Sequence, residues 1–157
     1  MSEVRVIGIG SPFGNDTLGW QTIERLKQQH ILATLLPERV NLIATDRPGV
    51  NLIQTLQGAS FVILVDAILD EHPHADVIRL SKDQLITAKN VLSSHSLDVA
   101  SAIALADKLH VLPEKLLLMG LAIDVQQAER IPEESIHKLV DAIIYELENY
   151  FAQARSN

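Results

Sequence analysis

The sequence contains no cysteine, few aromatic residues and fewer basic than acidic residues. Phenylalanine, tyrosine and tryptophan together make up 4% of the 157 residues. The absence of cysteine excludes disulfide bonds, thiol nucleophiles and thiolate metal sites, so any metal must be bound by histidine, carboxylate or backbone oxygen. The 13 basic and 20 acidic residues give a net charge of -7, without any run of lysine or arginine. This balance argues against nucleic acid or an anionic membrane as a partner.

Long hydrophobic runs are also missing from the chain. The longest apolar stretches are far shorter than the roughly 20 residues that a membrane-spanning helix needs. The first five residues lead directly into a predicted strand and leave no room for a signal peptide. We therefore expect a cytoplasmic protein with no membrane partner. The length and the hydrophobic content of 47% fit a single domain covering residues 1–157.

The hydrophobic pattern predicts an alternation of strands and helices. Apolar or alternating runs typical of strands occupy residues 4–9, 40–44, 61–65, 76–80 and 115–121. Helical spacing and helix-start signals predict helices at 17–29, at 50–56, from 93 or 94 to about 109, and from 132 onward, and a turn at 46–49. The third helix is expected to face the core with Leu97, Ala100, Ile103 and Ala104. The last is expected to bury Ile136, Leu139, Val140, Ile143, Leu147, Tyr150 and Phe151 and to fray from residue 153. Such an alternation predicts an α/β fold with a mostly parallel, twisted sheet covered on both faces. The polar–apolar alternation at 76–80 indicates an edge strand, and an antiparallel edge strand is compatible with an otherwise parallel sheet.

The first predicted strand leads into a glycine-rich turn that ends in an acidic residue. Gly8, Gly10 and Gly14 permit backbone conformations and close approaches that side chains would block. Asp16 then lies at the start of a helix, where a carboxylate is favoured. The glycine spacing differs from that of a dinucleotide-binding fingerprint, and no Gly-Lys-Ser/Thr follows to make a Walker A loop. Trp20, just after the turn, is predicted to pack on the sheet.

Two further residues are candidates for chemistry because of their positions. Asp66 follows the most hydrophobic run, 61–65, and is expected to mark the end of that strand. His95 begins a predicted helix, where the helix dipole favours a neutral imidazole that can bind a metal. In parallel α/β folds, ligands bind beyond the carboxyl ends of the strands. We therefore expect a cleft near residues 10–16 and Asp66.

Two carboxylates and one imidazole suit a divalent transition metal such as nickel or zinc, with coordination positions left open. Each residue also has a purely structural interpretation. Asp16 can cap a helix, Asp66 can accept hydrogen bonds from loop amides, and His95 can be a solvated first-turn residue. Hydrophobic spacing alone does not show whether the three residues converge.

Other polar residues carry less weight as candidates. His72 and His74 flank a proline in a predicted hairpin turn and are interpreted as surface histidines. No Gly-x-Ser-x-Gly elbow is present, and Ser93, Ser94 and Ser96 have no obvious base partner, so a serine hydrolase is not expected.

Five stretches follow one another along the chain: Gly8-Ile9-Gly10-Ser11-Pro12-Phe13-Gly14-Asn15-Asp16-Thr17-Leu18-Gly19-Trp20, Asp46-Arg47-Pro48-Gly49-Val50-Asn51-Leu52, Val62-Ile63-Leu64-Val65-Asp66-Ala67, Ser93-Ser94-His95-Ser96-Leu97 and Leu117-Leu118-Met119-Gly120. Taken together and in this order, they resemble the hydrogenase maturation proteases, endopeptidases that trim the C-terminal tail of the nickel–iron hydrogenase large subunit. It covers nearly the whole chain. It implies a three-layer α/β/α sandwich and a protein substrate.

The resemblance also implies roles for the three candidate residues. Asp16, Asp66 and His95 would bind the nickel already installed in the hydrogenase large-subunit precursor, and cleavage would follow only after nickel insertion. Another divalent metal, such as zinc or cadmium, could occupy the same site. Asp16 and Asp66 are the expected catalytic acids. Two mechanisms stay open: the nickel polarises the scissile carbonyl or activates water, or it serves only for recognition while one of the acids acts as the base.

The chain departs from the family pattern at several positions. Ser11 replaces the usual asparagine, Asn15 replaces the first of two acids, Arg47 stands where a small residue is common, and Ala122 lies in an altered segment after Gly120. These departures motivate an alternative hypothesis, a noncatalytic metal-sensing docking protein with the same fold. A third hypothesis is a small-molecule hydrolase that uses the same cleft.

Overall fold

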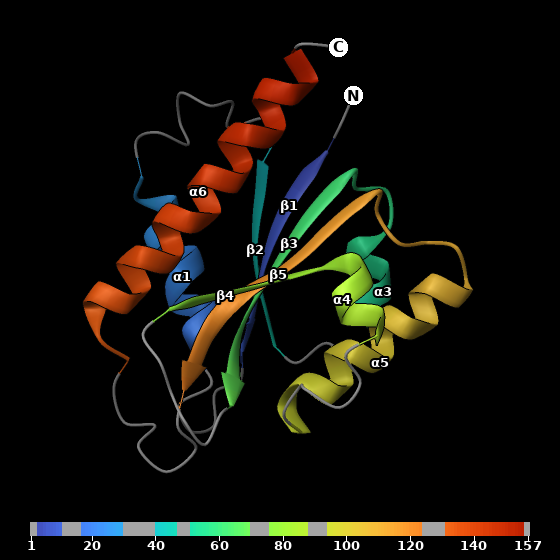
Figure 1. The fold of residues 1–157 in the computed structure, drawn as a ribbon, viewed down its shortest axis with the longest axis horizontal. Coiled ribbons are helices and arrows are strands. Elements are labelled where there is room, and N and C mark those ends of the chain that lie inside the picture. Colours follow the sequence, from blue (N-terminus) through green and yellow to red (C-terminus); the bar gives the residue numbers. More distant parts are fainter. Residues whose placement is uncertain are drawn as a thin grey trace.

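A five-stranded sheet forms the centre of the protein (Figure 1). The computed structural model describes residues 3–10, 17–29, 40–46, 51–69, 76–87, 94–123 and 131–155. The strands are β1 (Val4–Gly10), β2 (Val40–Asp46), β3 (Phe61–Leu69), β4 (Val77–Ser81) and β5 (Lys115–Ile123). The helices are α1 (Leu18–Lys27), α3 (Asn51–Leu56), α4 (Lys82–Thr87), α5 (Ser94–Lys108) and α6 (Glu133–Arg155).

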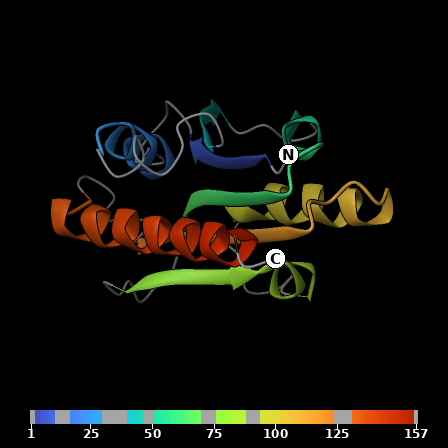
Figure 2. The same ribbon diagram turned by 90° about the horizontal axis from the view of Figure 1, so that it is seen from above.

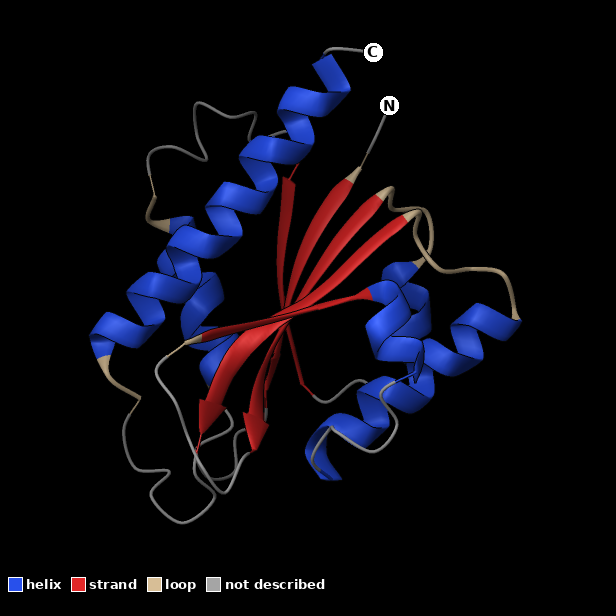
Figure 3. Ribbon diagram, viewed as in Figure 1, coloured by secondary structure: helices blue, strands red, loops and turns tan. Residues whose placement is uncertain are grey.

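The strand order in the sheet is β2-β1-β3-β5-β4, and Figure 2 shows the sheet nearly edge-on in this succession. β2, β1, β3 and β5 run parallel, whereas β4 pairs antiparallel with β5 at one edge. Helices α1 and α6 cover one face, and α3, α4 and α5 cover the other (Figure 3). The predicted three-layer α/β/α sandwich, with a mostly parallel sheet and one antiparallel edge strand, is confirmed.

Successive side chains of the central strands enter two separate cores, because side chains alternate between the faces of a sheet. In β3, the core beneath α1 and α6 takes Phe61, Ile63, Val65 and Ala67. The core beneath α3, α4 and α5 takes Val62, Leu64 and Ile68. Both faces are therefore buried, which explains why the run reads as continuously apolar.

Helix α6 confirms the predicted apolar spacing. Its first turn is closed by hydrogen bonds from the amides of Ser135 and Ile136 to the carbonyl of Pro132, the predicted opening residue. The fully buried apolar side chains of the predicted set are Ile136, Leu139, Val140, Ile143, Leu147 and Phe151. The helix continues to Arg155, so the fraying predicted from residue 153 is not found at residues 153–155.

Three sequence predictions needed correction. β3 does not end at Asp66, because its pairing with β5 continues to Leu69 opposite Ile123. β2 extends to Asp46, which was expected in the following turn, because its pairing with β1 reaches Gly10. The inner face of α5 buries Ala102 and Ala106, whereas Ala104, predicted to face inward, is only half-buried.

One short helix was not predicted. α4 is six residues long, too short to show a convincing helical period. Its start is marked instead by a capping box, in which the Gln84 amide donates to Ser81 Oγ and the Ser81 amide donates to Gln84 Oε1. The Ser-x-x-Gln spacing is the signal that would have identified it. Among the described residues, no helix has both the length and the apolar character that crossing a membrane requires.

Candidate functional site

Asp66 lies where two neighbouring strands separate. β1 pairs with β3 from Val4 opposite Phe61 to Gly8 opposite Val65. Asp66 is the next residue, and from there β3 continues only along β5. β1 has β2 on its other side, so the chain order reverses between β1 and β3. A crevice at the carboxyl ends of strands that diverge in this way is the usual ligand site of open α/β sheets.

The Asp66 side chain is nearly inaccessible to solvent. The residue is 2% exposed, and its Oδ1 accepts a hydrogen bond of 2.8 Å from the amide of Ala67. Burying a carboxylate is costly unless hydrogen bonds or a cation compensate the lost hydration. A buried acid at the carboxyl ends of the strands is therefore suited to holding a cation.

The alternation of β3 places Asp66 on the sheet face that α5 covers. Asp66 has the same parity as Val62, Leu64 and Ile68, which all pack in the core beneath α3, α4 and α5. α5 begins at Ser94, so His95 occupies its first turn. Figure 1 shows α5 starting near the end of the molecule toward which the β3 and β5 arrows point. His95 is thus on the expected helix end, and its side chain lies outside what the structure describes.

The start of α1 packs closely against β1 and β3. A Cβ atom at Gly19 would overlap the backbone of Ile9 and lie 2.8 Å from the carbonyl oxygen of Val65, and one at Gly8 would overlap the carbonyl of Gly19. The N-cap of α1 is Thr17, and its side chain makes no capping hydrogen bond. Asp16 directly precedes Thr17 in the chain but lies outside the described residues. The helix that follows Asp16 therefore packs next to Val65, the neighbour of Asp66.

The convergence of Asp16, Asp66 and His95 stays a prediction. Within the described ranges, no group of three or more histidine, aspartate or glutamate side chains is arranged to hold a metal ion. Asp16 and the His95 side chain are not part of those ranges, and neither are His72 and His74.

Trp20 confirms the prediction that it packs on the sheet. Its Nε1 donates a 2.8 Å hydrogen bond to the carbonyl of Thr45, and the residue is half-buried. The indole thereby joins the first turn of α1 to the carboxyl end of β2.

A doubly wound α/β sandwich with a buried acid at its switch point is a frequent enzyme architecture, and comparison with known proteins narrows the class. The family model described as hydrogenase maturation protease matches residues 21–149. The chain belongs to the hydrogenase maturation protease family, a family of peptide hydrolases.

Several solved structures share the fold. The hydrogenase maturating endopeptidase HybD from Escherichia coli superposes with a TM-score of 0.69 at 20% identity, over 98% of this chain and 93% of that one. An endopeptidase from Escherichia coli gives 0.75 at 19% identity, over 94% and 93%. The [NiFe] hydrogenase maturation protease HybD from Thermococcus kodakarensis gives 0.61 at 17% identity, over 94% and 98%. No curated protein matches the chain significantly.

Proposed function

We propose that this protein is an endopeptidase that removes the C-terminal tail of a nickel–iron hydrogenase large-subunit precursor after nickel has been inserted. In this proposal the nickel belongs to the substrate and serves as the recognition element. Asp16, Asp66 and His95 bind it, and Asp16 and Asp66 are the catalytic acids. The observation that carries the proposal is the buried carboxylate of Asp66 at the β1–β3 switch point of a chain in this family.

The chemistry of the donor set supports nickel as the recognised ion. Carboxylate oxygens and an imidazole nitrogen form a mixed O/N set that suits a borderline divalent metal, and three protein ligands leave positions for the ligands of the precursor. The helix-start position of His95 favours the neutral imidazole that binding requires. Once the nickel anchors the precursor, a neighbouring carboxylate accepts a proton from the water that attacks the scissile carbonyl.

Nickel-dependent recognition couples the cut to completed metal insertion. A precursor without nickel offers the three ligands nothing to bind, so the scissile bond is not held near the acids. Positioning of this kind supplies a large part of the rate enhancement of a hydrolase. The proposal therefore requires that the nickel-free precursor is not processed.

The test is a processing assay with purified, nickel-loaded precursor, in which tail loss is followed by mass spectrometry. The unmodified protein should convert the precursor to the trimmed form, and Asp66→Asn should slow conversion by about 100-fold or more because it removes a ligand and an acid. Asp107→Asn makes the same chemical change at the far, exposed end of α5 and should process at the normal rate.

Three outcomes would contradict the proposal. Normal processing by Asp66→Asn would remove Asp66 from the site. Tight binding of the nickel-loaded precursor without any trimmed product, with the unmodified protein, would identify a docking protein instead. Processing of the nickel-free precursor at the same rate would remove the recognition role of the metal.

A further inference from the structure

Two glycines, one in the neighbouring strand β5 and one in helix α1, closely approach the backbone of β3 around Asp66. Gly120 lies directly opposite Asp66 in the pairing of β3 with β5. Gly19 belongs to α1, which together with α6 covers one face of the sheet, and a Cβ atom at Gly19 would lie 2.8 Å from the carbonyl oxygen of Val65. Two consecutive peptide groups of β3 are therefore bounded by residues without side chains.

The approach at Gly120 is closer than any side chain allows. A Cβ atom at this position would overlap the carbonyl oxygen of Asp66 and lie 3.1 Å from its carbonyl carbon. The contacted atoms are backbone atoms in the centre of the sheet, which cannot move aside as the end of a flexible side chain can.

Strand alternation shows on which side this contact falls. In β5, Leu116 and Leu118 enter the core beneath α3, α4 and α5, so position 120 faces that side as well. The Asp66 side chain faces the same side. The absence of a Cβ at Gly120 thus lets the Asp66 carbonyl come close to β5, so that β5 defines the orientation of the Asp66 peptide group.

We propose that Gly120 is a positioning residue for the Asp66 carboxylate, and that Gly19 supports the same stretch of β3 from the α1 side. The functional part of this inference rests on the proposed role of Asp66 as a nickel ligand. A tilt of the Asp66 peptide moves the attached carboxylate and the Ala67 amide that donates to Oδ1 at 2.8 Å. A displacement of about 1 Å is enough to impair a metal or catalytic site.

The first experiment compares Gly120→Ala with Gly58→Ala. Gly58 has a φ of +86°, so alanine is strained there, but its Cβ would meet only Arg5 Nη2 at 3.7 Å, before the start of β3. Both variants lose stability, and only Gly120→Ala touches Asp66. Titration of the untagged proteins with nickel chloride should give a dissociation constant raised about 10-fold to 100-fold for Gly120→Ala. Gly58→Ala should bind nickel as the unmodified protein does.

A second readout in the same variants does not depend on metal. The amide proton of Ala67 reports its hydrogen bond to Asp66 in NMR spectra, so its chemical shift should move in Gly120→Ala and stay in place in Gly58→Ala. An unchanged Ala67 resonance and unchanged nickel affinity in folded Gly120→Ala would overturn the inference. If the unmodified protein binds neither nickel nor precursor, the proposed function fails, and the Ala67 resonance still decides the positioning role.

A measurement on the unmodified protein covers the case in which Gly120→Ala does not fold. If the glycines hold the Asp66 peptide rigidly, the Ala67 amide exchanges its hydrogen only through global unfolding, as slowly as the amide of Leu64 in the centre of β3. Exchange of Ala67 about 100-fold faster than Leu64 would show local freedom at Asp66 and would overturn the inference.

Discussion

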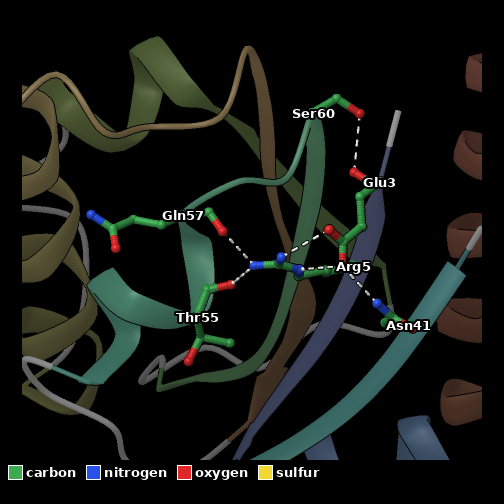
Figure 4. A network of polar contacts seen from close by, with 6 residues as sticks. All are labelled: Glu3, Arg5, Asn41, Thr55, Gln57 and Ser60. Atoms are coloured by element: carbon green, nitrogen blue, oxygen red, sulfur yellow. Dashed lines mark hydrogen bonds and ion pairs between the residues drawn. The ribbon is translucent and has the colours of Figure 1, made fainter. Parts of the chain in front are cut away.

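At the residue scale, a network of hydrogen bonds joins Glu3, Arg5 and Asn41 near the amino ends of β1 and β2. This network lies at the other end of the sheet from Asp66. Figure 4 shows Arg5 donating from Nη1 to the carbonyls of Thr55 and Gln57, at 2.6 and 2.8 Å, and from Nε to Glu3 Oε1 at 3.2 Å. Asn41 donates to the same carboxylate at 2.8 Å. These contacts stabilise the ionised form of Glu3, and the hydrogen bond from Arg5 is the main reason why its pKa lies below the ordinary value of 4.5.

The lowered pKa of Glu3 predicts a pH dependence of stability. A carboxyl group whose pKa is lower in the folded than in the unfolded protein contributes stability above its unfolded pKa. That contribution is lost as the pH falls from about 4.5 through the folded pKa. We expect the urea midpoint of the unmodified protein to fall more steeply in this range than that of Glu3→Gln.

Arg5→Gln provides the control for this titration. It removes the charge and the Nε donor but keeps a polar side chain, so the pKa of Glu3 should return toward its ordinary value. The steeper fall of the urea midpoint at acid pH should then disappear, even though Glu3 is still present. An equally steep loss in Glu3→Gln would assign the acid sensitivity to another carboxylate.

At the element scale, Arg5 anchors the short helix α3. The two carbonyls that it binds belong to Thr55 and Gln57, at the end of the helix, where carbonyl groups have no partner within the helix. Arg5→Ala should lower the free energy of unfolding by about 1.5–3 kcal/mol, the range for hydrogen bonds to a charged group. Chemical denaturation measures this loss.

Arg25 offers a comparison at the surface. It pairs with Glu133, which is 80% exposed, and exposed ion pairs contribute about 0–1 kcal/mol. Arg25→Ala should therefore cost less than Arg5→Ala. Equal losses would mean that the Arg5 contacts with α3 contribute no more than an ordinary surface pair.

Helix α6 provides a second prediction, because its two faces differ sharply. Leu139 is fully buried, whereas Tyr145 on the same helix is 64% exposed. Leu139→Ala should lower the free energy of unfolding by about 2–5 kcal/mol through lost burial and a residual cavity. Tyr145→Ala should stay within about 0.5 kcal/mol. Similar losses from the two variants, measured by denaturant unfolding, would contradict the packing of α6 on the sheet.

At the scale of the whole molecule, the sheet separates two cores that share the same strands. Leu139 lies in the core beneath α1 and α6, and Ile103 lies in the core beneath α3, α4 and α5. Because β1, β3 and β5 contribute to both, we expect the two cores to unfold in one transition.

The double variant Leu139→Ala with Ile103→Ala tests this architecture. The two side chains lie on opposite sides of the sheet and belong to different hydrophobic clusters. Their losses in unfolding free energy should therefore add within about 0.5 kcal/mol, and each variant should show a single transition by fluorescence and circular dichroism. Two separate transitions would mean that the faces fold independently.

The local pattern of apolar and polar residues was sufficient to predict most of the strands and helices of this protein. Continuous apolar runs predicted the buried strands, and the 3.6-residue spacing of apolar residues predicted α6, because both patterns report burial directly. Asp66 stood out for the same reason, as a charge directly after the most apolar run. Short α4 was missed because six residues show little periodicity, and β3 was ended too early because its last residues are held by pairing with β5.

What the sequence by itself determined is the α/β class, the order of its elements, the resemblance that the family match confirms and the choice of Asp66 as a candidate acid. Only the tertiary structure decided that Asp66 lies where β1 and β3 separate, that it faces the α5 side, and that Gly19 and Gly120 contact its strand. These facts depend on the neighbours of β3 in the sheet. Residues far apart in the chain become neighbours through pairing and packing, which no local pattern of apolar residues encodes.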